Sequence, residues 1–334
     1  MKSMLDTQEK IFIAGGTGMV GSAIKRAFEG YITKNKEFKL SILAPTRKEL
    51  NLYDYAQVKS WFEENKPSIV ILAAAKVGGI YANKTYPVDF LIKNLKIQNN
   101  VIESAFSHNI KRLLFLGSSC IYPKFSKQPI KEEYLLTGAL EKTNEFYAIA
   151  KIAGLKLCES LRSQYNFDAI SLMPTNLYGP NDNYHSENSH VVASLIRKFS
   201  IAKLSNLSKV TCWGTGKVRR EFMHVDDLAD AIIFCLTHWN PNDINSPKDS
   251  FGYSVNHLNV GTGKDITIKE LANLIAELTN FKGRIEWDKS KPDGTPRKKL
   301  DTSLLKDLGW ESKINLKNGL ISTIKNLDIS TITN

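Results

Sequence analysis

The sequence predicts an α/β protein in which a doubly wound parallel sheet is joined to a smaller, mixed α/β part. Short apolar segments alternate with helical patterns through the first 175 residues, as expected when helices connect the parallel strands of one sheet. After Pro174 the alternation loosens into a polar loop, and the later segments are shorter and mixed. The expected strands are residues 11–14, 39–44, 68–74, 112–116 and 169–173.

The first expected strand runs directly into a glycine-rich turn, and a helical pattern follows at once. Gly16, Gly18 and Gly21 fit the spacing G-x-G-x-x-G, while Gly15, Gly18 and Gly21 fit G-x-x-G-x-x-G. Glycines at these positions let the backbone approach a pyrophosphate at the N-terminus of the helix. The turn therefore indicates a Rossmann-like dinucleotide site, and a glycine-rich hairpin or a tight packing turn is the alternative.

The second expected strand is followed by Arg47 and Lys48, without an adjacent acid. An enzyme that uses NAD usually has an acidic residue here, which binds the ribose hydroxyls. Basic side chains suit the 2′-phosphate of NADP instead, so we expect NADP(H) as the cofactor. Two surface charges that open the next turn are the alternative.

The fourth expected strand, 112–116, is a buried apolar run that ends in small polar residues. The carboxyl ends of strands in an open parallel sheet line the ligand crevice. Ser118 should therefore project its hydroxyl into the same crevice as the nicotinamide.

Tyr147 and Lys151 lie four residues apart in a stretch of good helix formers, so they should share one helix face. We expect the ammonium of Lys151 to lower the pKa of the phenol from its usual value of about 10. Such a tyrosine can exchange a proton with a carbonyl or an alcohol. The pair alone could be an accident of an amphipathic helix. Together with Ser118 and the glycine turn, however, it resembles the arrangement in short-chain dehydrogenases.

Composition excludes few classes but favours some. The net charge of +11 is scattered and comes with no nucleic-acid-binding motif, so part of it should serve phosphorylated ligands. The longest relevant apolar run, 69–75, is too short to cross a membrane, and the first ten residues are polar. We expect a soluble cytoplasmic protein that binds neither nucleic acid nor membrane. The four cysteines predict neither a metal site nor a disulfide, and Cys158 and Cys235 should be core residues.

Six blocks of the sequence resemble the GDP-L-fucose synthase family, within the extended short-chain dehydrogenase/reductases. Lys-Val-Gly-Gly-Ile, Ser-Ser-Cys-Ile-Tyr-Pro and Lys-Pro-Asp-Gly-Thr-Pro-Arg-Lys are the most particular of the matching motifs. The resemblance runs from about residue 10 to about residue 325. The blocks are residues 73–80, 117–123, 147–151, 174–180, 220–227 and 291–298.

The resemblance implies a GDP-4-keto-6-deoxy-D-mannose 3,5-epimerase/4-reductase, which forms GDP-L-fucose by epimerisation at C3 and C5 and hydride transfer from NADPH to C4. Protons at C3 and C5 of a 4-ketosugar are acidic because the enolate spreads its charge onto the C4 oxygen, which Ser118 and Tyr147 can stabilise. The resemblance assigns proton removal and delivery to Cys120 and His190. From the residues alone, these two could equally be a core thiol and a neighbour of a helix cap.

The resemblance also implies the site residues and a homodimer. The catalytic set is Ser118, Cys120, Tyr147, Lys151 and His190. The cofactor set is Gly15, Gly16, Thr17, Gly18, Met19, Val20, Gly21, Arg47, Asn51, Leu52, Lys151, Pro174, Asn176, Leu177 and His190. The GDP-sugar set is Asn176, Lys198, Trp213, Arg220 and Asp293. Trp213 could instead simply pack, and Asp293 could only shape its turn.

A capped helical pattern from Val225 and a strand that ends near Gly263 suggest that the chain returns to its first part. We expect an NADP-binding Rossmann domain of residues 1–176 and about 213–262, and a substrate-binding domain of about 177–212 and 263–334.

Two departures from relatives concern ligand binding. Relatives often carry His-Arg in place of Gly16-Thr17, and arginine in place of Lys198. The first departure leaves more of the NADP-phosphate contact to Arg47, and the second loses the fork geometry that grips a diphosphate.

Two rival functions remain open. The nearest is another nucleotide-sugar epimerase or dehydratase of the same fold that retains NAD. An idle dinucleotide-sensing or RNA-associated protein is the second.

Overall fold

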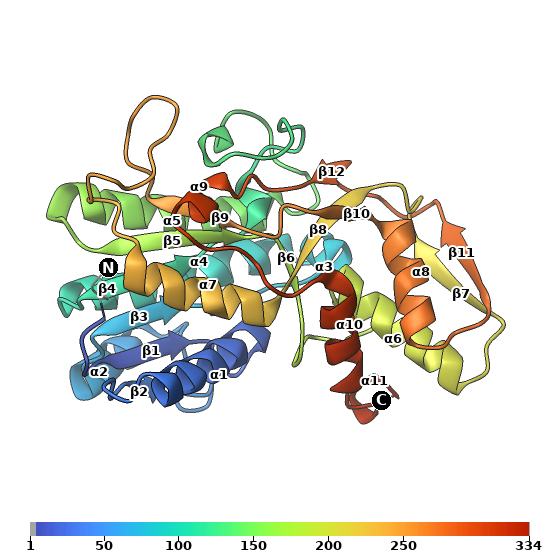
Figure 1. Ribbon diagram of the computed structural model, residues 1–334, viewed down its shortest axis with the longest axis horizontal. Helices are drawn as coiled ribbons and strands as arrows, with labels where there is room; N and C mark the ends of the chain where they lie inside the picture. The colour runs from blue at the N-terminus through green and yellow to red at the C-terminus, as the bar shows by residue number, and fades with distance from the viewer. Residues whose placement is uncertain (1–4, 334) are drawn as a thin grey trace.

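The computed structural model describes residues 5–333 and contains the predicted doubly wound sheet (Figure 1). Its six strands lie in the order β2-β1-β3-β4-β5-β9, and all neighbouring strands are parallel. All five expected strands are present, so the predicted fold class is confirmed. The strands are β1 (Lys10–Ala14), β2 (Ser41–Leu43), β3 (Ile69–Leu72), β4 (Arg112–Leu116), β5 (Ala169–Pro174) and β9 (His257–Val260).

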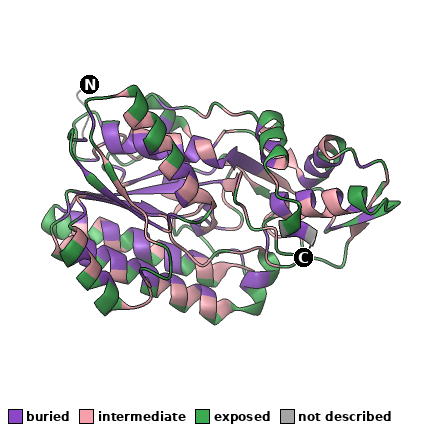
Figure 2. Ribbon diagram, turned by 90° about the horizontal axis from the view of Figure 1, so that it is seen from below, coloured by how far each residue is buried: buried purple, intermediate pink, exposed green. Residues whose placement is uncertain are grey.

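Helices cover both faces of this sheet because successive strand residues point to opposite sides. Ile11 and Ile13 of β1 pack in one core with α1 and α7, whereas Phe12 and Ala14 pack in a second core with α2, α4 and α5. Figure 2 shows the buried strands between the two helical layers. These helices are α1 (Met19–Lys34), α2 (Tyr55–Asn65), α4 (Pro87–Ser107), α5 (Glu145–Tyr165) and α7 (Val225–His238).

A smaller part of the molecule lies beside the carboxyl ends of these strands. Its central strand, β8, pairs with β6, β10 and β12, while β7 and β11 form a separate parallel pair. Helices α6, α8 and α10 pack with these strands around a third core. The strands are β6 (Asn176–Tyr178), β7 (Lys209–Trp213), β8 (Arg219–His224), β10 (Asp265–Thr267), β11 (Arg284–Asp288) and β12 (Arg297–Lys298). The helices are α6 (Val191–Leu204), α8 (Ile268–Leu278) and α10 (Leu316–Lys325), and the short helices α3 (Ile80–Thr85), α9 (Ser303–Asp307) and α11 (Ser330–Thr333) complete the chain.

The chain crosses between the two parts more than once. After β8 it returns to the large sheet, where α7 packs against α1 and β9 becomes the sixth strand. It then enters the smaller part again at β10. A division into two domains near residues 176, 213 and 262 remains our proposal. Strand β8 falls in its segment 213–262, although β8 pairs with β6, β10 and β12 of the smaller part.

A buried carboxylate ties these crossing segments together next to the cleft. Glu221 of β8 accepts hydrogen bonds from the backbone N–H groups of Thr262, Gly263 and Leu300, at 2.5, 2.7 and 2.7 Å. Burial raises the pKa of Glu221, and these donors oppose that effect. The contacts fix β8 relative to the turn after β9 and to the segment after β12, and so position the side chains that β8 and β12 present.

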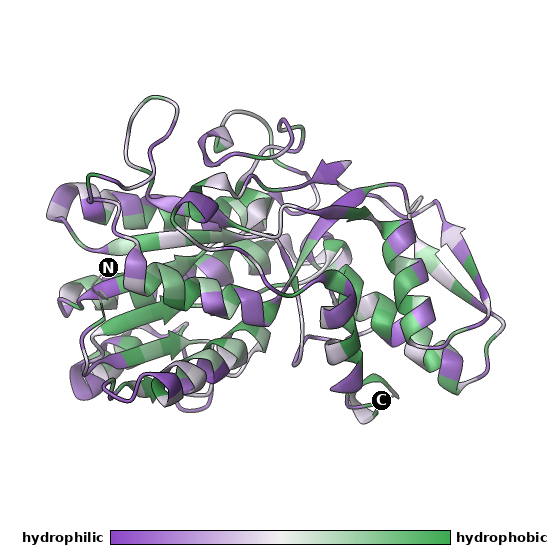
Figure 3. Cartoon of the chain, viewed as in Figure 1, coloured by the Kyte–Doolittle hydropathy of each residue, from purple (hydrophilic) through white to green (hydrophobic). Residues whose placement is uncertain are grey.

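Hydropathy follows the layers, since the strands of the large sheet are apolar and the outer helix faces are polar (Figure 3). Within residues 5–333, no helix combines the length and the apolar character that a membrane span requires.

Candidate active site

A cleft of about 1250 Å³ opens at the carboxyl ends of the parallel strands, against the smaller part. Every residue of the predicted catalytic, cofactor and substrate sets lines it except Gly16. The sequence therefore identified side chains and turns that the fold brings to one place. Their individual roles stay predictions.

The glycine turn after β1 is shaped by close backbone contacts. Gly15 has a φ of +89°, and a Cβ there would lie 2.8 Å from the backbone of Ala74. A Cβ on Gly21 would collide with the carbonyl oxygen of Gly15. Gly18 differs, because its nearest such neighbour is 3.6 Å away and it precedes α1 with no side-chain cap. The helix N-terminus is thus left open toward the cleft, as anion binding requires.

Arg47 follows β2 and is exposed where it lines the cleft. Its guanidinium lies 5.1 Å from the ring centre of Tyr53, within the range of a cation–π contact. The neighbouring loop is held by Asn100, which donates to the carbonyl oxygen of Leu52 at 2.9 Å. These contacts orient the Arg47 side chain in the cleft that the glycine turn also lines.

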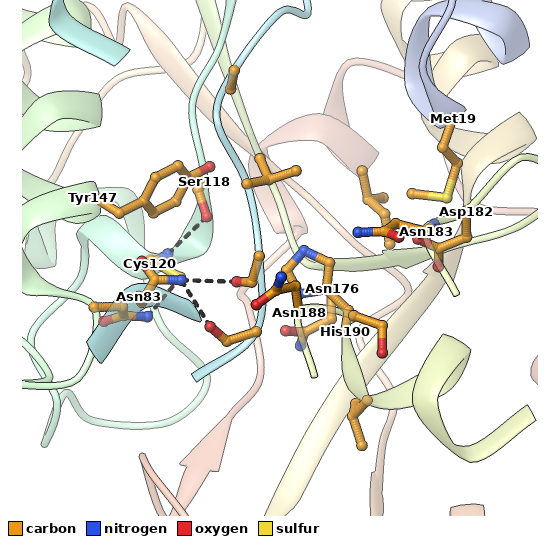
Figure 4. A pocket seen from close by; sticks show the side chains of 18 of the residues that line it. Met19, Asn83, Ser118, Cys120, Tyr147, Asn176, Asp182, Asn183, Asn188 and His190 are labelled. Carbon is orange, nitrogen blue, oxygen red and sulfur yellow. Dashed lines mark hydrogen bonds between the residues drawn. The ribbon is translucent and has the colours of Figure 1, made fainter. Parts of the chain in front are cut away.

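Ser118 lies two residues after β4 in an extended conformation and is the N-cap of a short 3₁₀ turn, residues Ser119–Ile121. Its Oγ accepts a hydrogen bond from the backbone N–H of Cys120 at 3.2 Å. Figure 4 shows Ser118 and Tyr147 side by side. The hydroxyl and the phenol can therefore meet the same substrate oxygen.

Lys151 lies one turn after Tyr147 on α5, but it does not lower the pKa of the phenol as expected. Its ammonium is buried, donates to the carbonyl oxygen of Leu116 at 2.8 Å and lies 4.8 Å from the ring centre of Phe115. Burial lowers the pKa of Lys151 to about 7. Burial and the nearby negative charge of Cys120 instead raise the pKa of Tyr147, while Ser118 opposes the rise. In the unliganded protein Tyr147 is therefore held as a proton donor.

Cys120 lies at the surface of the cleft, so the alternative of a core thiol is wrong. Its Sγ accepts a hydrogen bond from Nδ2 of Asn144 at 3.2 Å, and Nζ of Lys298 lies 3.5 Å away. Cys158 and Cys235 are fully buried, as predicted. Polar partners distinguish Cys120 from these structural thiols.

His190 occupies the N-cap position of α6, but its side chain makes no capping hydrogen bond. Its side chain is exposed and lines the cleft instead, where the surrounding protein atoms and the positive charge of Lys298 lower its pKa. The turn before His190 packs against Gly79, whose N–H donates to the carbonyl oxygen of Asn188 at 3.1 Å. Asn83 donates to the carbonyl oxygens of Gly78 and Gly79 and so fixes the backbone against which this turn packs (Figure 4).

The predicted GDP-sugar residues gather at the other end of the cleft. Trp213 is 43% exposed, and the ammonium groups of Lys198 and Lys291 each lie 5.3 Å from its ring centre. Lys198 also donates to the carbonyl oxygen of Thr211 at 2.9 Å. A half-exposed aromatic ring with two cations close to it does more than simple packing would require, and it suits an anionic, ring-containing ligand.

Asp293 shapes a turn, as the alternative proposed. Its Oδ1 and Oδ2 accept hydrogen bonds from N and Oγ1 of Thr215, at 2.8 and 2.7 Å. Its backbone carbonyl accepts a hydrogen bond from Arg220 at 3.1 Å. Asn176 donates to the carbonyl oxygen of Glu221 at 2.8 Å. Asp293 thus orders the backbone around Arg220, whatever else it contacts when substrate is bound.

Sequence reasoning missed Gly79, Asn144, Lys291 and Lys298 as parts of this site. Three of them lie in the motifs that carry the family resemblance, so the signal was present although no role was assigned. Asn144 immediately precedes α5, three residues before Tyr147. Its position next to Cys120 depends on a loop geometry that the sequence does not show.

The fold and the site define a dinucleotide-dependent reductase that also carries a thiol and an imidazole beside its tyrosine, lysine and serine. Comparison with known proteins agrees. Residues 11–246 match the model of the NAD dependent epimerase/dehydratase family. GDP-L-fucose synthase 1 of Arabidopsis thaliana is 52% identical over 97% of this chain and 94% of its own, and GDP-L-fucose synthase of Escherichia coli is 51% identical over 95% and 96%. The chain therefore belongs to the NAD dependent epimerase/dehydratase family and, within it, to the GDP-L-fucose synthases.

A solved structure supports both the fold and the type of cofactor. A GDP-D-glycero-L-gluco-heptose synthase from Campylobacter jejuni, determined in the presence of NADPH, superposes with a TM-score of 0.85 at 36% identity. The match covers 96% of this chain and 98% of that one.

Proposed function

We propose that the protein converts GDP-4-keto-6-deoxy-D-mannose to GDP-L-fucose, by epimerisation at C3 and C5 followed by NADPH-dependent reduction at C4. One observation carries this proposal: Cys120 and His190 line the same cleft as Ser118, Tyr147 and Lys151. Reduction alone needs a proton donor at the substrate oxygen, which Tyr147 supplies. Inversion of a carbon centre needs a second pair of groups that remove and deliver protons, and a thiol and an imidazole suit that task.

The residues of the cleft also fit a dinucleotide. The close-packed glycine turn, the open N-terminus of α1 and the exposed guanidinium of Arg47 form a cradle for phosphate groups. We propose that the whole predicted cofactor set holds NADP(H), with Arg47 at the 2′-phosphate. When bound, this cofactor supplies the hydride for C4.

In the proposed epimerisation, the Sγ of Cys120 removes the proton at C3 or C5, and His190 delivers a proton to the opposite face of the same carbon. Ser118 and Tyr147 donate hydrogen bonds to the C4 oxygen, where the enolate charge collects. In the reduction, Tyr147 gives its phenolic proton to that oxygen, and its raised pKa favours holding the proton until then. Lys198, Trp213 and Lys291 bind the GDP end of the substrate.

The proposal is tested by incubating the purified protein with NADPH and GDP-4-keto-6-deoxy-D-mannose in D₂O. We expect GDP-L-fucose with deuterium at C3 and C5, identified by NMR and mass spectrometry. A reduced sugar without inversion would show a plain reductase. Turnover of another nucleotide sugar without net NADPH consumption would favour an epimerase or dehydratase that retains its cofactor.

We further infer that the protein acts as a homodimer. Val88 and Ile92 on α4, and Phe146 and Ile149 on α5, are apolar and 40% or more exposed on two helices that pack together. Apolar exposure on neighbouring helices marks a surface for a second copy. Light scattering should give twice the chain mass of 37.5 kDa, and Ile92→Glu should shift the protein toward the monomer. A monomeric parent protein would contradict this inference.

We also propose a cytoplasmic location, because the function needs a reduced Cys120 and a supply of NADPH. Fractionation of the source cells, with detection of the protein in the soluble cytoplasmic fraction, tests this point.

A further inference from the structure

Lys298 is a charged neighbour of both proposed proton-transfer groups. It lies on β12, which pairs in parallel with β8 and sets Lys298 opposite Arg220. Its Nζ is 3.5 Å from the Sγ of Cys120, and its charge also acts on His190. All four side chains line the cleft.

Epimerisation makes two electrostatic demands that one positive charge can meet. The base must be a thiolate, although an ordinary cysteine has a pKa of about 8.5 and is mostly protonated at neutral pH. The acid must release its proton to a weakly basic carbon. A cation beside both groups stabilises the thiolate and makes the imidazolium a stronger acid.

We propose that Lys298 is a positioning residue that holds Cys120 as a thiolate for proton removal. In each inversion, a C–H bond breaks as the S–H bond forms, and an N–H bond of His190 breaks as the new C–H bond forms on the opposite face. Lys298 keeps its own protons throughout. The catalytic meaning of this arrangement rests on the proposed function, but the electrostatic coupling belongs to the unliganded protein.

Other groups around Cys120 do not replace Lys298. Asn144 donates a neutral hydrogen bond. Arg220 is a second positive charge that acts on Cys120, but its hydrogen bonds go to the carbonyl oxygens of Arg219 and Asp293, whereas Lys298 contacts the sulfur directly. The charged and titratable groups that face Cys120 from the surrounding elements are Tyr147 of α5, His190 before α6, Arg220 of β8, Lys298 of β12, and Glu141 of the loop before α5, which pairs with Lys124.

The rate at which iodoacetamide alkylates Cys120 measures its thiolate directly, without substrate. Cys158, Cys212 and Cys235 are buried, so Cys120 should react first, and Cys120→Ser gives the background. The rate is followed by peptide mass spectrometry from about pH 5 to about pH 10, a range that brackets the usual thiol pKa. The proteins compared are the parent, Lys298→Met, Lys298→Arg and the matched control Lys299→Met. Lys299 carries the same charge one residue further along, where an extended chain points its side chain the other way.

We expect Lys298→Met to slow alkylation of Cys120 about tenfold at neutral pH, because a thiolate without the neighbouring cation is less stable. Lys298→Arg should retain most of the parent behaviour, and Lys299→Met all of it. With substrate in D₂O, Lys298→Met should also slow deuterium incorporation at C3 and C5 while leaving the affinity for GDP unchanged.

An alkylation profile of Lys298→Met that coincides with the parent's would overturn the proposal, as would an equal slowing in Lys299→Met. A loss of GDP affinity with an unchanged profile would make Lys298 a diphosphate ligand instead. Binding of NADPH reports whether Lys298→Met is folded; if it is not, Lys298→Gln takes its place. A protein that shows the slowing but forms no GDP-L-fucose would refute the proposed function and leave the coupling of Lys298 to Cys120 in place.

Discussion

A Cβ atom on Gly79 would lie 2.5 Å from the backbone carbonyl oxygen of Ser189, the residue before His190. Gly79 also donates its N–H to the carbonyl oxygen of Asn188 at 3.1 Å. The second glycine of the Lys-Val-Gly-Gly-Ile motif is thus in direct contact with the turn that presents His190. The motif therefore influences the proposed proton transfer by positioning the turn that carries His190.

Gly79→Ala should push this turn away and misplace the imidazole. Overpacking of this kind costs about 1–3 kcal/mol of folding stability, and a displacement of about 1 Å at a reacting group can cost about 10²-fold in rate. We expect deuterium incorporation at C3 and C5 to fall far more than NADPH binding does. Gly30→Ala is the control, since nothing surrounds that position. Parent exchange rates in Gly79→Ala would show that the turn can absorb the extra methyl group.

Cys120→Ser separates the two halves of the proposed reaction. The serine hydroxyl is far too weak an acid to ionise and act as the base. The reduction groups Ser118, Tyr147 and Lys151 remain in place. Deuterium incorporation should therefore be lost first, and residual NADPH oxidation should give an unepimerised 6-deoxyhexose, GDP-rhamnose or its C4 epimer. His190→Asn should instead let exchange outlast inversion. Full production of GDP-L-fucose by Cys120→Ser would remove the thiol from the mechanism.

Arg47→Ala should weaken NADPH selectively. A hydrogen bond between charged groups contributes about 1.5–3 kcal/mol, so the KM for NADPH should rise about 10- to 100-fold while that for NADH stays nearly unchanged. Lys48→Ala, at the adjacent residue, serves as the control because Lys48 does not line the cleft. Initial rates with each cofactor give the two KM values. An equal loss of activity with NADPH and NADH would show that Arg47 supports the structure and does not bind the 2′-phosphate.

The buried amine of Lys151 should make stability depend on pH in a defined window. Its pKa is about 7 in the folded protein and about 10.4 in an unfolded chain. Between these values the unfolded chain binds a proton that the folded protein does not, so the free energy of unfolding rises with pH. Relative to Lys151→Met, the parent should gain stability from about pH 7 to about pH 10, on the order of 4 kcal/mol at most. Below about pH 7 the difference should level off.

Urea denaturation of both proteins without cofactor, at several pH values, measures this difference. A constant difference between parent and Lys151→Met across the window would mean that the amine stays charged in the fold.

Local patterns predicted the large sheet correctly, and they named residues that the fold brings into one cleft. The strands are apolar runs, and the glycine turn and the strand-end Ser118 are defined by neighbours in sequence. The pKa of Tyr147 was predicted in the wrong direction, because Lys151 directs its ammonium to the carbonyl oxygen of Leu116. Spacing along a helix shows which residues share a face, but it does not show which partner a long side chain selects.

Contacts between segments far apart in the chain could not be predicted from the sequence, for a similar reason. Lys298 reaches Cys120 only because β12 pairs with β8, and Asp293 reaches Thr215 across a separation of 78 residues. Such pairings depend on tertiary register, and no periodicity within either segment predicts them.

The late return of β9 and α7 to the large sheet has a consequence for dissecting the gene. A fragment that stopped after β6 would leave β5 as an unprotected sheet edge and would uncover the apolar face of α1 that α7 covers. Such a fragment should aggregate even though it contains the complete glycine turn and the tyrosine–lysine pair. Circular permutation, which keeps every segment, is the better route to moving the chain ends.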